Sequence, residues 1–252
     1  MKSFLTLLLT VFTLNGFAQN LEGKINYEIK RTMNFDDSRF SEMPKDMRDR
    51  IKERMEKMGN AKKVLEFNRA ATVYRAYDPA KDAKDDSEWE DNADGGRGWR
   101  MMGAKTITHY SVEKSVITEQ REFMDKQFLI KDESRGDGWK LTGKMEAILG
   151  YPCQEATTMM NDTVPVVAWF CPSIPVSSGP EGYNGLPGMI LKLDYNNSEL
   201  IAEAITLEDI KINADDLEQP NKGKKVTREE FTAIVKEKTD EMRKMGGGGF
   251  RR

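Results

Sequence analysis

The sequence predicts a mainly β protein of the α+β class, built as one large curved antiparallel sheet with two packing helices. Short segments in which apolar and polar residues alternate recur along most of the chain, as half-buried strands require. Brief turns rich in Gly, Asn and Asp separate these segments, and such short connections favour antiparallel neighbours. Only two segments show the spacing of an amphipathic helix instead. With 38% hydrophobic residues, the 252-residue chain can fill one core, and a half-barrel is one outline that the sheet could take.

Residues 1–18 are typical of a secretory signal peptide. Lys2 precedes the apolar run Phe4–Leu14, and Gly16–Ala18 supplies the small residues of a cleavage site. The run is too short for a membrane span, and no second apolar run is long enough to cross a bilayer. We therefore expect export to the periplasm or the cell surface, without a transmembrane span in the mature chain.

The first half of the expected β domain, residues 19–225, contains strands, a helix and a charged loop. Gly23–Met33 and Val64–Tyr77 alternate with the period of strands. Residues 41–59 break that period and predict the first helix, which Gly59 would cap. Its expected inner stripe consists of Met47, Ile51, Met55 and Met58.

Residues 78–102 form an acidic stretch that ends near a run of glycines, and we expect a long surface loop there. Part of it resembles the first half of a calcium-binding EF-hand loop, in the residues Glu90, Asn92, Asp94 and Gly95. The twelfth position of such a loop requires a bidentate Glu, but here it is Met101. A solvated loop is therefore favoured over a calcium site.

The second half of the domain is expected to consist of strands up to a C-terminal helix. The expected strands are residues 104–112, 115–132, 138–143, 151–160, 164–171, 189–195 and 199–213. Residues 226–252 then form a helix and a flexible Gly-rich tail. Thr227 and Glu230 predict a capping box at the start of that helix. Its expected inner stripe consists of Phe231, Ile234, Val235, Lys238, Met242 and Met245.

The chain has two cysteines, Cys153 and Cys171, which lie at equal distances in sequence from Asp162. A hairpin centred on Asp162 would place them directly opposite each other, where cross-strand side chains are roughly 4.5–5.5 Å apart. In an oxidising compartment this favours a disulfide. Two buried free thiols are the alternative, because a shift of one residue would turn the side chains to opposite faces.

The segment before the strand at 189–195 carries the most distinctive motif of the chain. It reads Gly185, Leu186, Pro187, Gly188, Met189 and Ile190. Proline followed by glycine predicts a type II turn at Leu186–Gly188. Together with Trp139, Tyr151–Cys153 and Trp169 upstream, the motif resembles the GLPGLI family of bacterial cell-envelope proteins, with Met for Leu at the fifth position. The resemblance implies an envelope protein without an established activity.

The motif itself contains no nucleophile, acid or metal ligand, so we interpret it as structural, with a rigid exposed loop for a partner as the alternative. The only histidine, His109, has no GxSxG or HExxH motif to support a catalytic role. The 15 methionines could bind Cu(I), but most lie at core spacing. No cofactor is expected. The net charge of −3 and the lack of a basic patch argue against nucleic acid.

These observations favour a non-catalytic interaction or accessory module whose partner is an envelope protein or an outer-membrane complex. An alternative is a carrier that holds a lipophilic ligand between sheet and helix, because methionine side chains adapt to irregular shapes. A hydrolytic enzyme without a recognisable motif comes third, since acidic residues are plentiful but no spacing pairs them.

Overall fold

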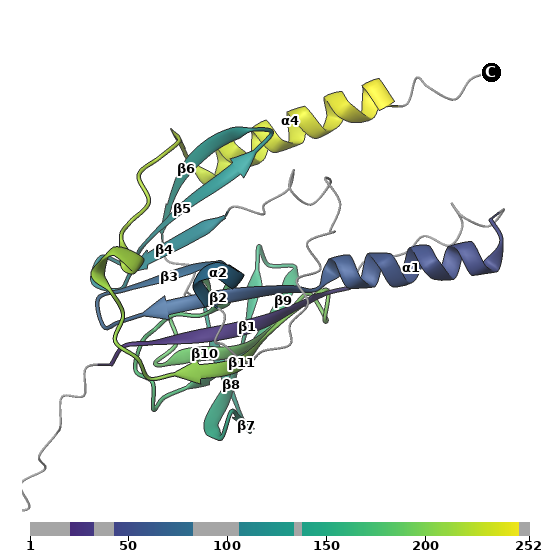
Figure 1. Ribbon diagram of the computed structural model, residues 1–252. Coiled ribbons are helices and arrows are strands. Elements are labelled where there is room, and N and C mark those ends of the chain that lie inside the picture. Colours follow the sequence, from purple (N-terminus) through teal and green to yellow (C-terminus); the bar gives the residue numbers. More distant parts are fainter. Residues whose placement is uncertain (1–20, 33–42, 83–105, 134–137, 247–252) are drawn as a thin grey trace, which may run out of the picture.

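The computed structural model describes residues 21–32, 43–82, 106–133 and 138–246. They form a single twelve-stranded sheet that is not closed (Figure 1), which confirms the mainly β class. The strands are β1 (Gly23–Arg31), β2 (Ala61–Phe67), β3 (Ala71–Ala76), β4 (Ile107–Ser111), β5 (Val116–Phe123), β6 (Lys126–Glu133), β7 (Lys140–Ile148), β8 (Tyr151–Met160), β9 (Val164–Cys171), β10 (Met189–Tyr195), β11 (Leu200–Glu208) and β12 (Lys224–Val226). The predicted signal peptide, residues 83–102 of the predicted acidic loop and the end of the tail lie outside the described residues.

Short and long helices accompany the sheet. They are α1 (Lys45–Gly59), α2 (Pro79–Asp82), α4 (Arg228–Gly246) and the 3₁₀ turns η2 (Pro180–Gly182) and η3 (Ala214–Leu217). The strand order is β12-β6-β5-β4-β3-β2-β1-β11-β10-β9-β8-β7, and every neighbouring pair is antiparallel except β12 with β6. The sheet therefore consists of two meanders that meet where β1 pairs with β11.

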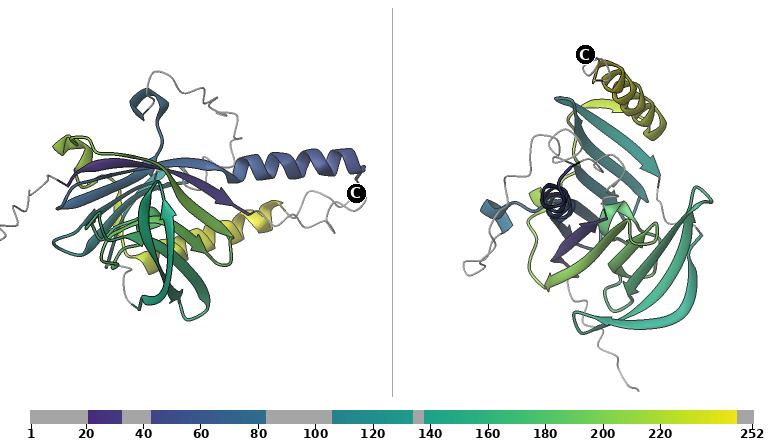
Figure 2. Two further views of the ribbon diagram at one scale, coloured as in Figure 1. Left: turned by 90° about the horizontal axis from the view of Figure 1, so that it is seen from below. Right: turned by 90° about the vertical axis from the view of Figure 1, so that its right-hand side faces the viewer.

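The connection from β6 to β7 requires the sheet to curve. Ten strand spacings separate these two strands in the sheet order, which in a flat sheet would be about 48 Å. The chain passes from Glu133 to Lys140 in seven residues, which span at most roughly 25 Å. The two ends of the sheet must therefore approach each other, and Figure 2 shows the resulting curved, open sheet.

The two faces of the sheet differ in what covers them. We call the face that carries Ile25, Tyr27 and Ile29 the inner face, and all three side chains are almost fully buried there. The chain between β9 and β10 lies against this face, where the Tyr74 hydroxyl donates to Glu181 at 3.1 Å, and Tyr27 donates a hydrogen bond of 2.7 Å to the carbonyl oxygen of Ile190 in β10. The outer face carries Lys24 and is covered in part by α2 and η3 (Figure 1).

The two long helices behave differently. In α4, Phe231 packs edge-on against Phe123 and Phe128 on the inner face of β5 and β6. The predicted capping box is confirmed, since the Thr227 amide donates to the Glu230 carboxylate (2.8 Å) and the Glu230 amide to the Thr227 hydroxyl (3.2 Å). α1 extends beyond the end of β1 (Figures 1 and 2), and Met47, the one member of its predicted inner stripe whose side chain the structure describes, is exposed.

Two predicted single strands are hairpins. The segment predicted at 64–77 folds into β2 and β3, because the Asn68 side chain accepts hydrogen bonds from the amides of Ala70 and Ala71 and closes a turn. The segment predicted at 115–132 folds into β5 and β6 around Met124 and Asp125, both with positive φ. Neither turn contains glycine, so the usual hairpin signal was missing from the sequence.

Candidate functional site

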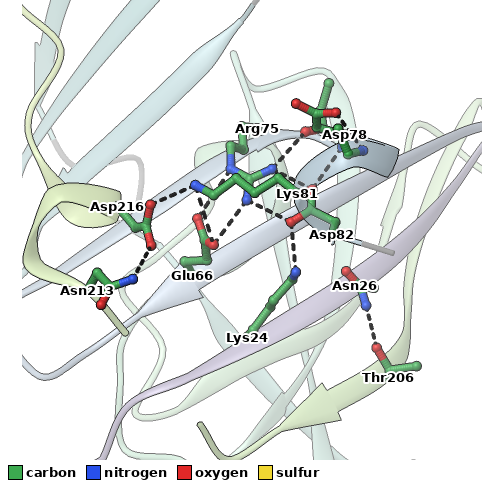
Figure 3. A network of polar contacts seen from close by, with 12 residues as sticks. Lys24, Asn26, Glu66, Arg75, Asp78, Lys81, Asp82, Thr206, Asn213 and Asp216 are labelled. Carbon is green, nitrogen blue, oxygen red and sulfur yellow. Dashed lines mark hydrogen bonds and ion pairs between the residues drawn. The ribbon is translucent and has the colours of Figure 1, made fainter. Parts of the chain in front are cut away.

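Six charged side chains on the outer face of β1, β2 and β3 form a closed ion network (Figure 3). Its members are Lys24, Glu66, Arg75, Lys81, Asp82 and Asp216. Asp82 is the centre: its carboxylate accepts from Lys24 (2.7 Å) and from Arg75 (2.6 Å), and its side chain is 0% exposed. Arg75 also reaches Glu66 at 3.0 Å. The sequence had placed Asp82 in a solvated loop, whereas α2 turns it into the network.

The pKa values in the network follow from these contacts. Burial acts to raise the pKa of Asp82, but the hydrogen bonds from Arg75 and Lys24 outweigh it and hold that pKa well below its ordinary value. Burial acts to lower the pKa of Arg75, but the hydrogen bonds to Asp82 and Glu66 outweigh burial and raise that pKa above its ordinary value. The hydrogen bond from Lys81 likewise lowers the pKa of Asp216. Asp82, Arg75 and Asp216 therefore stay charged at neutral pH.

This arrangement favours a structural role for the network. A general acid or base needs a pKa near the working pH, and Asp82 and Arg75 are both shifted away from it. Three cations balance three carboxylates, so the cluster offers no surplus charge to a substrate. Lys81 bonds Asp216 at 2.7 Å, which ties α2 to η3 above the sheet. Among the described residues, no group of three His, Cys, Asp or Glu side chains is placed to hold a metal ion.

His109 lies on the same outer face, in β4, and is buried. Burial lowers the pKa of its imidazole, and its Nδ1 atom has no hydrogen-bond partner. The residues opposite it in the sheet are Val73 and Thr118, neither of which is acidic. The described strands therefore bring no carboxylate opposite the imidazole, as a catalytic triad would need.

We call the connection between β9 and β10, residues 172–188, the family-like segment. Glu181 fixes it to the inner face of the sheet. This residue has a positive φ of 56°, which is unusual for a residue with a side chain. Its carboxylate accepts from Lys63 (2.6 Å) and from the hydroxyl of Tyr74 (3.1 Å). Burial would raise the pKa of Glu181, but the charge and hydrogen bond of Lys63 outweigh it and lower the pKa. Glu181 thus connects the loop to β2 and β3.

The predicted turn at Leu186–Gly188 is tight but is not the expected type II turn. The Gly188 amide donates to the carbonyl of Leu186 (2.8 Å), which closes a three-residue turn around Pro187. A Cβ atom on Gly188 would collide with the carbonyl oxygen of Cys171, so only glycine fits there. Leu186, Met189 and Ile190 are buried, as a structural role for the hexapeptide requires.

The predicted hairpin register around Asp162 is found, since Met160 pairs with Val164 and Gln154 with Phe170. The predicted disulfide between Cys153 and Cys171 is not found, since both thiols are free and buried. Burial raises the pKa of the Cys153 thiol to about 12, and Cys171 adds to that shift.

Two adjacent methionines, Met159 and Met160, point to opposite faces of β8, because side chains alternate along a strand. Met159 is exposed, whereas the sulfur of Met160 accepts from Tyr183 at 3.8 Å. They therefore do not converge on one ion.

The most exposed strand of the sheet is β7, which forms one of its two ends. Eight of its nine residues are exposed, and only Ile148 is buried. The exposed residues include large apolar side chains: Leu141 is 62% exposed and Met145 67%. Trp139, just before the strand, donates a hydrogen bond of 2.9 Å to the carbonyl of Asn184 and so fixes the start of β7 to the family-like segment.

The ladder between β7 and β8 determines which face each side chain occupies. It pairs Lys140 with Thr157, Leu141 with Ala156, Met145 with Gln154 and Glu146 with Cys153. Leu141 and Met145 therefore share the inner face, while Lys140 and Glu146 lie on the outer face. Glu146 contacts Lys192 at 3.0 Å. We call these four residues of β7, Lys140, Leu141, Met145 and Glu146, the β7 surface.

A bulge lies in the middle of the β7 surface, where residues 142–144 face the single residue Glu155. The Glu155 carboxylate accepts from the Thr142 hydroxyl (2.9 Å) and pairs with Lys144 (3.0 Å). Gly143 has a positive φ of 82°, and a Cβ atom there would meet nothing within 4 Å. The bulge is therefore held by specific contacts, and the space that a side chain at its centre would occupy is empty.

The sequence did not predict this surface because the expected strand ended at Gly143, although a glycine inside a strand often marks a bulge. The apolar positions Leu141 and Met145 are four residues apart, which suits one face of a strand. Nothing in that spacing tells an exposed face from a buried one. The edge position comes from the strand order, which pairs segments far apart in sequence.

A family model described as "Protein of unknown function (Porph_ging)" matches residues 99–192, which include β7, Glu181 and the hexapeptide. The family name GLPGLI is not part of that description but is compatible with it. No curated protein matches the sequence.

Two solved structures, described as PNGF-II in space groups P21 and C2, share the fold. The first has a TM-score of 0.54 and 15% identity, and the match covers 85% of this chain and 33% of that chain. The second has a TM-score of 0.53 and 14% identity, with 85% and 32% covered. This chain thus spans about a third of the length of the chains it resembles, and at this identity the likeness shows the fold alone. None of the described helices is long and apolar enough to cross a membrane.

Proposed function

We propose that the protein is an exported, non-catalytic protein of the cell envelope that binds an envelope protein through the β7 surface. The single observation that carries this proposal is the exposure of β7, a nine-residue edge strand with two large apolar side chains on one face. The partner in this proposal is an envelope protein or an outer-membrane complex.

The physics of an edge strand supports binding at this place. No strand among the described residues pairs with its outer row of backbone N–H and C=O groups, so an added strand can do so. Proteins usually blunt such edges with short strands, charges or bulges, because an open edge leads to aggregation. β7 is long and carries a single bulge, which leaves regular strand on both sides of Gly143.

The exposed apolar side chains of β7, Leu141 and Met145, also favour binding of a partner. Burying an exposed Leu or Met side chain against a partner contributes about 1.5–3 kcal/mol, and Met is enriched at protein interfaces. Leu141 and Met145 lie on the same face of β7, so one partner strand can cover both. The charged residues Lys140 and Glu146, on the other face, can then select the partner.

The non-catalytic part of the proposal is supported by the charged groups that the structure describes. The ion network is internally balanced, and the carboxylate of Glu181 is bound by Lys63 and Tyr74. The carrier alternative receives no comparable support, because Tyr27 packs in one buried apolar cluster with Ile190, Leu191 and Leu193. Export is supported by the signal-like residues 1–18, and N-terminal sequencing of the mature protein tests it.

Site-specific photo-crosslinking in cells tests the binding proposal. A benzoylphenylalanine is placed at Leu141 in one variant and at Ile210 in a control variant. Ile210 is also an exposed apolar residue but lies outside the sheet strands. We expect a discrete cross-linked product from position 141 and none from position 210.

Equal labelling from both positions, or from neither, would contradict the proposal. Adding Met145→Lys to the Leu141 variant should remove the product. Thermal unfolding of the same proteins shows that the fold is retained.

A further inference from the structure

We infer that the partner of the β7 surface is a second copy of this chain, joined through an antiparallel β7–β7 pair with its twofold axis at Gly143. This inference rests on the proposed function and names the partner of the same site. The side-chain pattern of β7, its bulge and its position at the end of the sheet all support this pairing.

An antiparallel pair between two identical strands sets strict rules for the register. Residues directly opposite each other lie on the same face of the joined sheet. With the axis at Gly143, Leu141 lies opposite Met145 of the second copy, and both belong to the inner face. Lys140 lies opposite Glu146 of the second copy, and both belong to the outer face. In this register, the two residues of each pair therefore lie on the same face of the joined sheet.

The charges favour this register over its neighbours. Each dimer contains the Lys140–Glu146 pair twice and the Leu141–Met145 pair twice. Moving the axis to Thr142 would place Lys140 opposite Lys144, and moving it to Lys144 would place that residue opposite itself. Like charges directly opposite each other destabilise a strand pair, whereas opposite charges and apolar pairs stabilise it.

The bulge does not interfere with this pairing. Both strands carry the same three residues, 142–144, between Leu141 and Met145, so the two copies stay in register on both sides of the axis. At the axis, Gly143 of one copy lies opposite Gly143 of the other, and neither residue has a side chain that could hinder the pairing. Glu155 holds Thr142 and Lys144 on the β8 side, which fixes the bulge before a partner arrives.

The symmetry also explains how an exposed edge can exist without fibre formation. A twofold pair uses the same surface on both copies and is complete with two chains. It covers both β7 edges at once. The remaining end of each sheet is β12, a strand of only three residues that is too short to extend the sheet well.

Charge reversal tests the inference without removing the strand. We expect the mature chain to sediment as a dimer in analytical ultracentrifugation. Lys140→Glu and Glu146→Lys should each weaken the dimer by about tenfold or more, because each places like charges opposite each other twice. An equimolar mixture of the two variants should form a heterodimer, and the double variant K140E/E146K should dimerise with itself. Lys236→Glu, an exposed lysine on α4, is the matched control and should leave the dimer unchanged.

A mature chain that is monomeric at all concentrations would overturn the inference, and so would a dimer that Lys140→Glu leaves intact or a mixture that forms no heterodimer. The same cross-link at Leu141 separates this failure from that of the proposed function. If the chain is monomeric but position 141 captures a different envelope protein, the proposed function stands and the second copy is wrong.

Discussion

The ion network and the β7 surface differ in whether their interacting groups already have partners within the chain. In the ion network, every member is paired with an opposite charge, and Asp82 is fully buried. On β7, a whole strand edge and the side chains of Leu141 and Met145 remain exposed. The densest charge cluster is therefore the part of the molecule that is already complete. The sparse apolar edge is the part that still needs a partner.

The two regions should respond differently to substitution: changes in the ion network should affect folding, and changes on β7 should affect association. The first region is held by buried charge pairs, in which loss of one partner leaves another charge buried and unpaired. The second contributes little to the fold of the single chain, because its side chains are already in water.

The largest expected effect comes from Asp82→Ala. Removing this carboxylate leaves Lys24 and Arg75 without their shared partner, and breaking a buried pair in this way typically costs about 3–5 kcal/mol. Urea unfolding measures the loss in the free energy of unfolding. Asp216→Ala is the control, because its pair with Lys81 is more exposed and should cost at most about 1 kcal/mol. Equal losses for the two variants would contradict the central role of Asp82.

The next effect concerns the corner before β10. Gly188→Ala places a methyl group on the carbonyl oxygen of Cys171, so the backbone must move, at a cost of about 1–3 kcal/mol. Gly143→Ala in β7 is a useful comparison, because its methyl group would meet nothing within 4 Å and only the positive φ opposes it. Thermal unfolding should rank Gly188→Ala as the more destabilising change. The reverse ranking would show that the corner is not tightly packed.

Acid should weaken the ion network in a defined direction. The pKa of Asp82 is lower in the folded protein than in the unfolded chain, so its contribution is complete above about pH 4, the ordinary pKa of Asp. It is lost as the pH falls from there through the lower folded pKa. Unfolding free energies measured between pH 7 and pH 2 should therefore fall less steeply for Asp82→Asn than for the natural chain. Parallel curves would mean that Asp82 is not the acid-sensitive group.

The smallest effect on stability is expected at β7. Leu141→Lys and Met145→Lys replace side chains that are already exposed, so each should change the unfolding free energy of the single chain by no more than about 0.5 kcal/mol. The same variants should abolish association through β7. Chemical unfolding at low protein concentration measures the first quantity, and cross-linking the second. A large loss of stability would show that these side chains are part of the fold.

Much of the fold could be predicted from the sequence because alternation and turn residues are local signals. They predicted β8, β9 and β10 almost to the residue, along with the capping box of α4. The hairpins at Asn68 and at Met124–Asp125 were missed because those turns lack glycine. The inner stripe predicted for α1 is not buried at Met47, because apolar spacing indicates a face of the helix without showing what covers it.

The candidate site could not be predicted, because it depends on which strand is last in the sheet. β7 follows β6 in the chain, yet lies at the opposite end of the strand order. The ion network also joins distant parts of the sequence, from Lys24 to Asp216, so no local spacing of acids and bases reveals it. Both features follow from long-range pairing, for which one sequence gives no direct signal.

Hydrogen exchange along β7 tests the central claim most directly, namely that this free edge pairs with another strand. The β7 amides that point away from β8 should exchange slowly in the associated protein and quickly in the Lys140→Glu variant or after dilution to monomers. The other amides of residues 140–148 already pair with β8 in the single chain. Strands β1 and β2 should exchange slowly in both forms, because neighbours cover them on both sides. Exchange along β7 that is equally fast in the associated and dissociated protein would contradict the account.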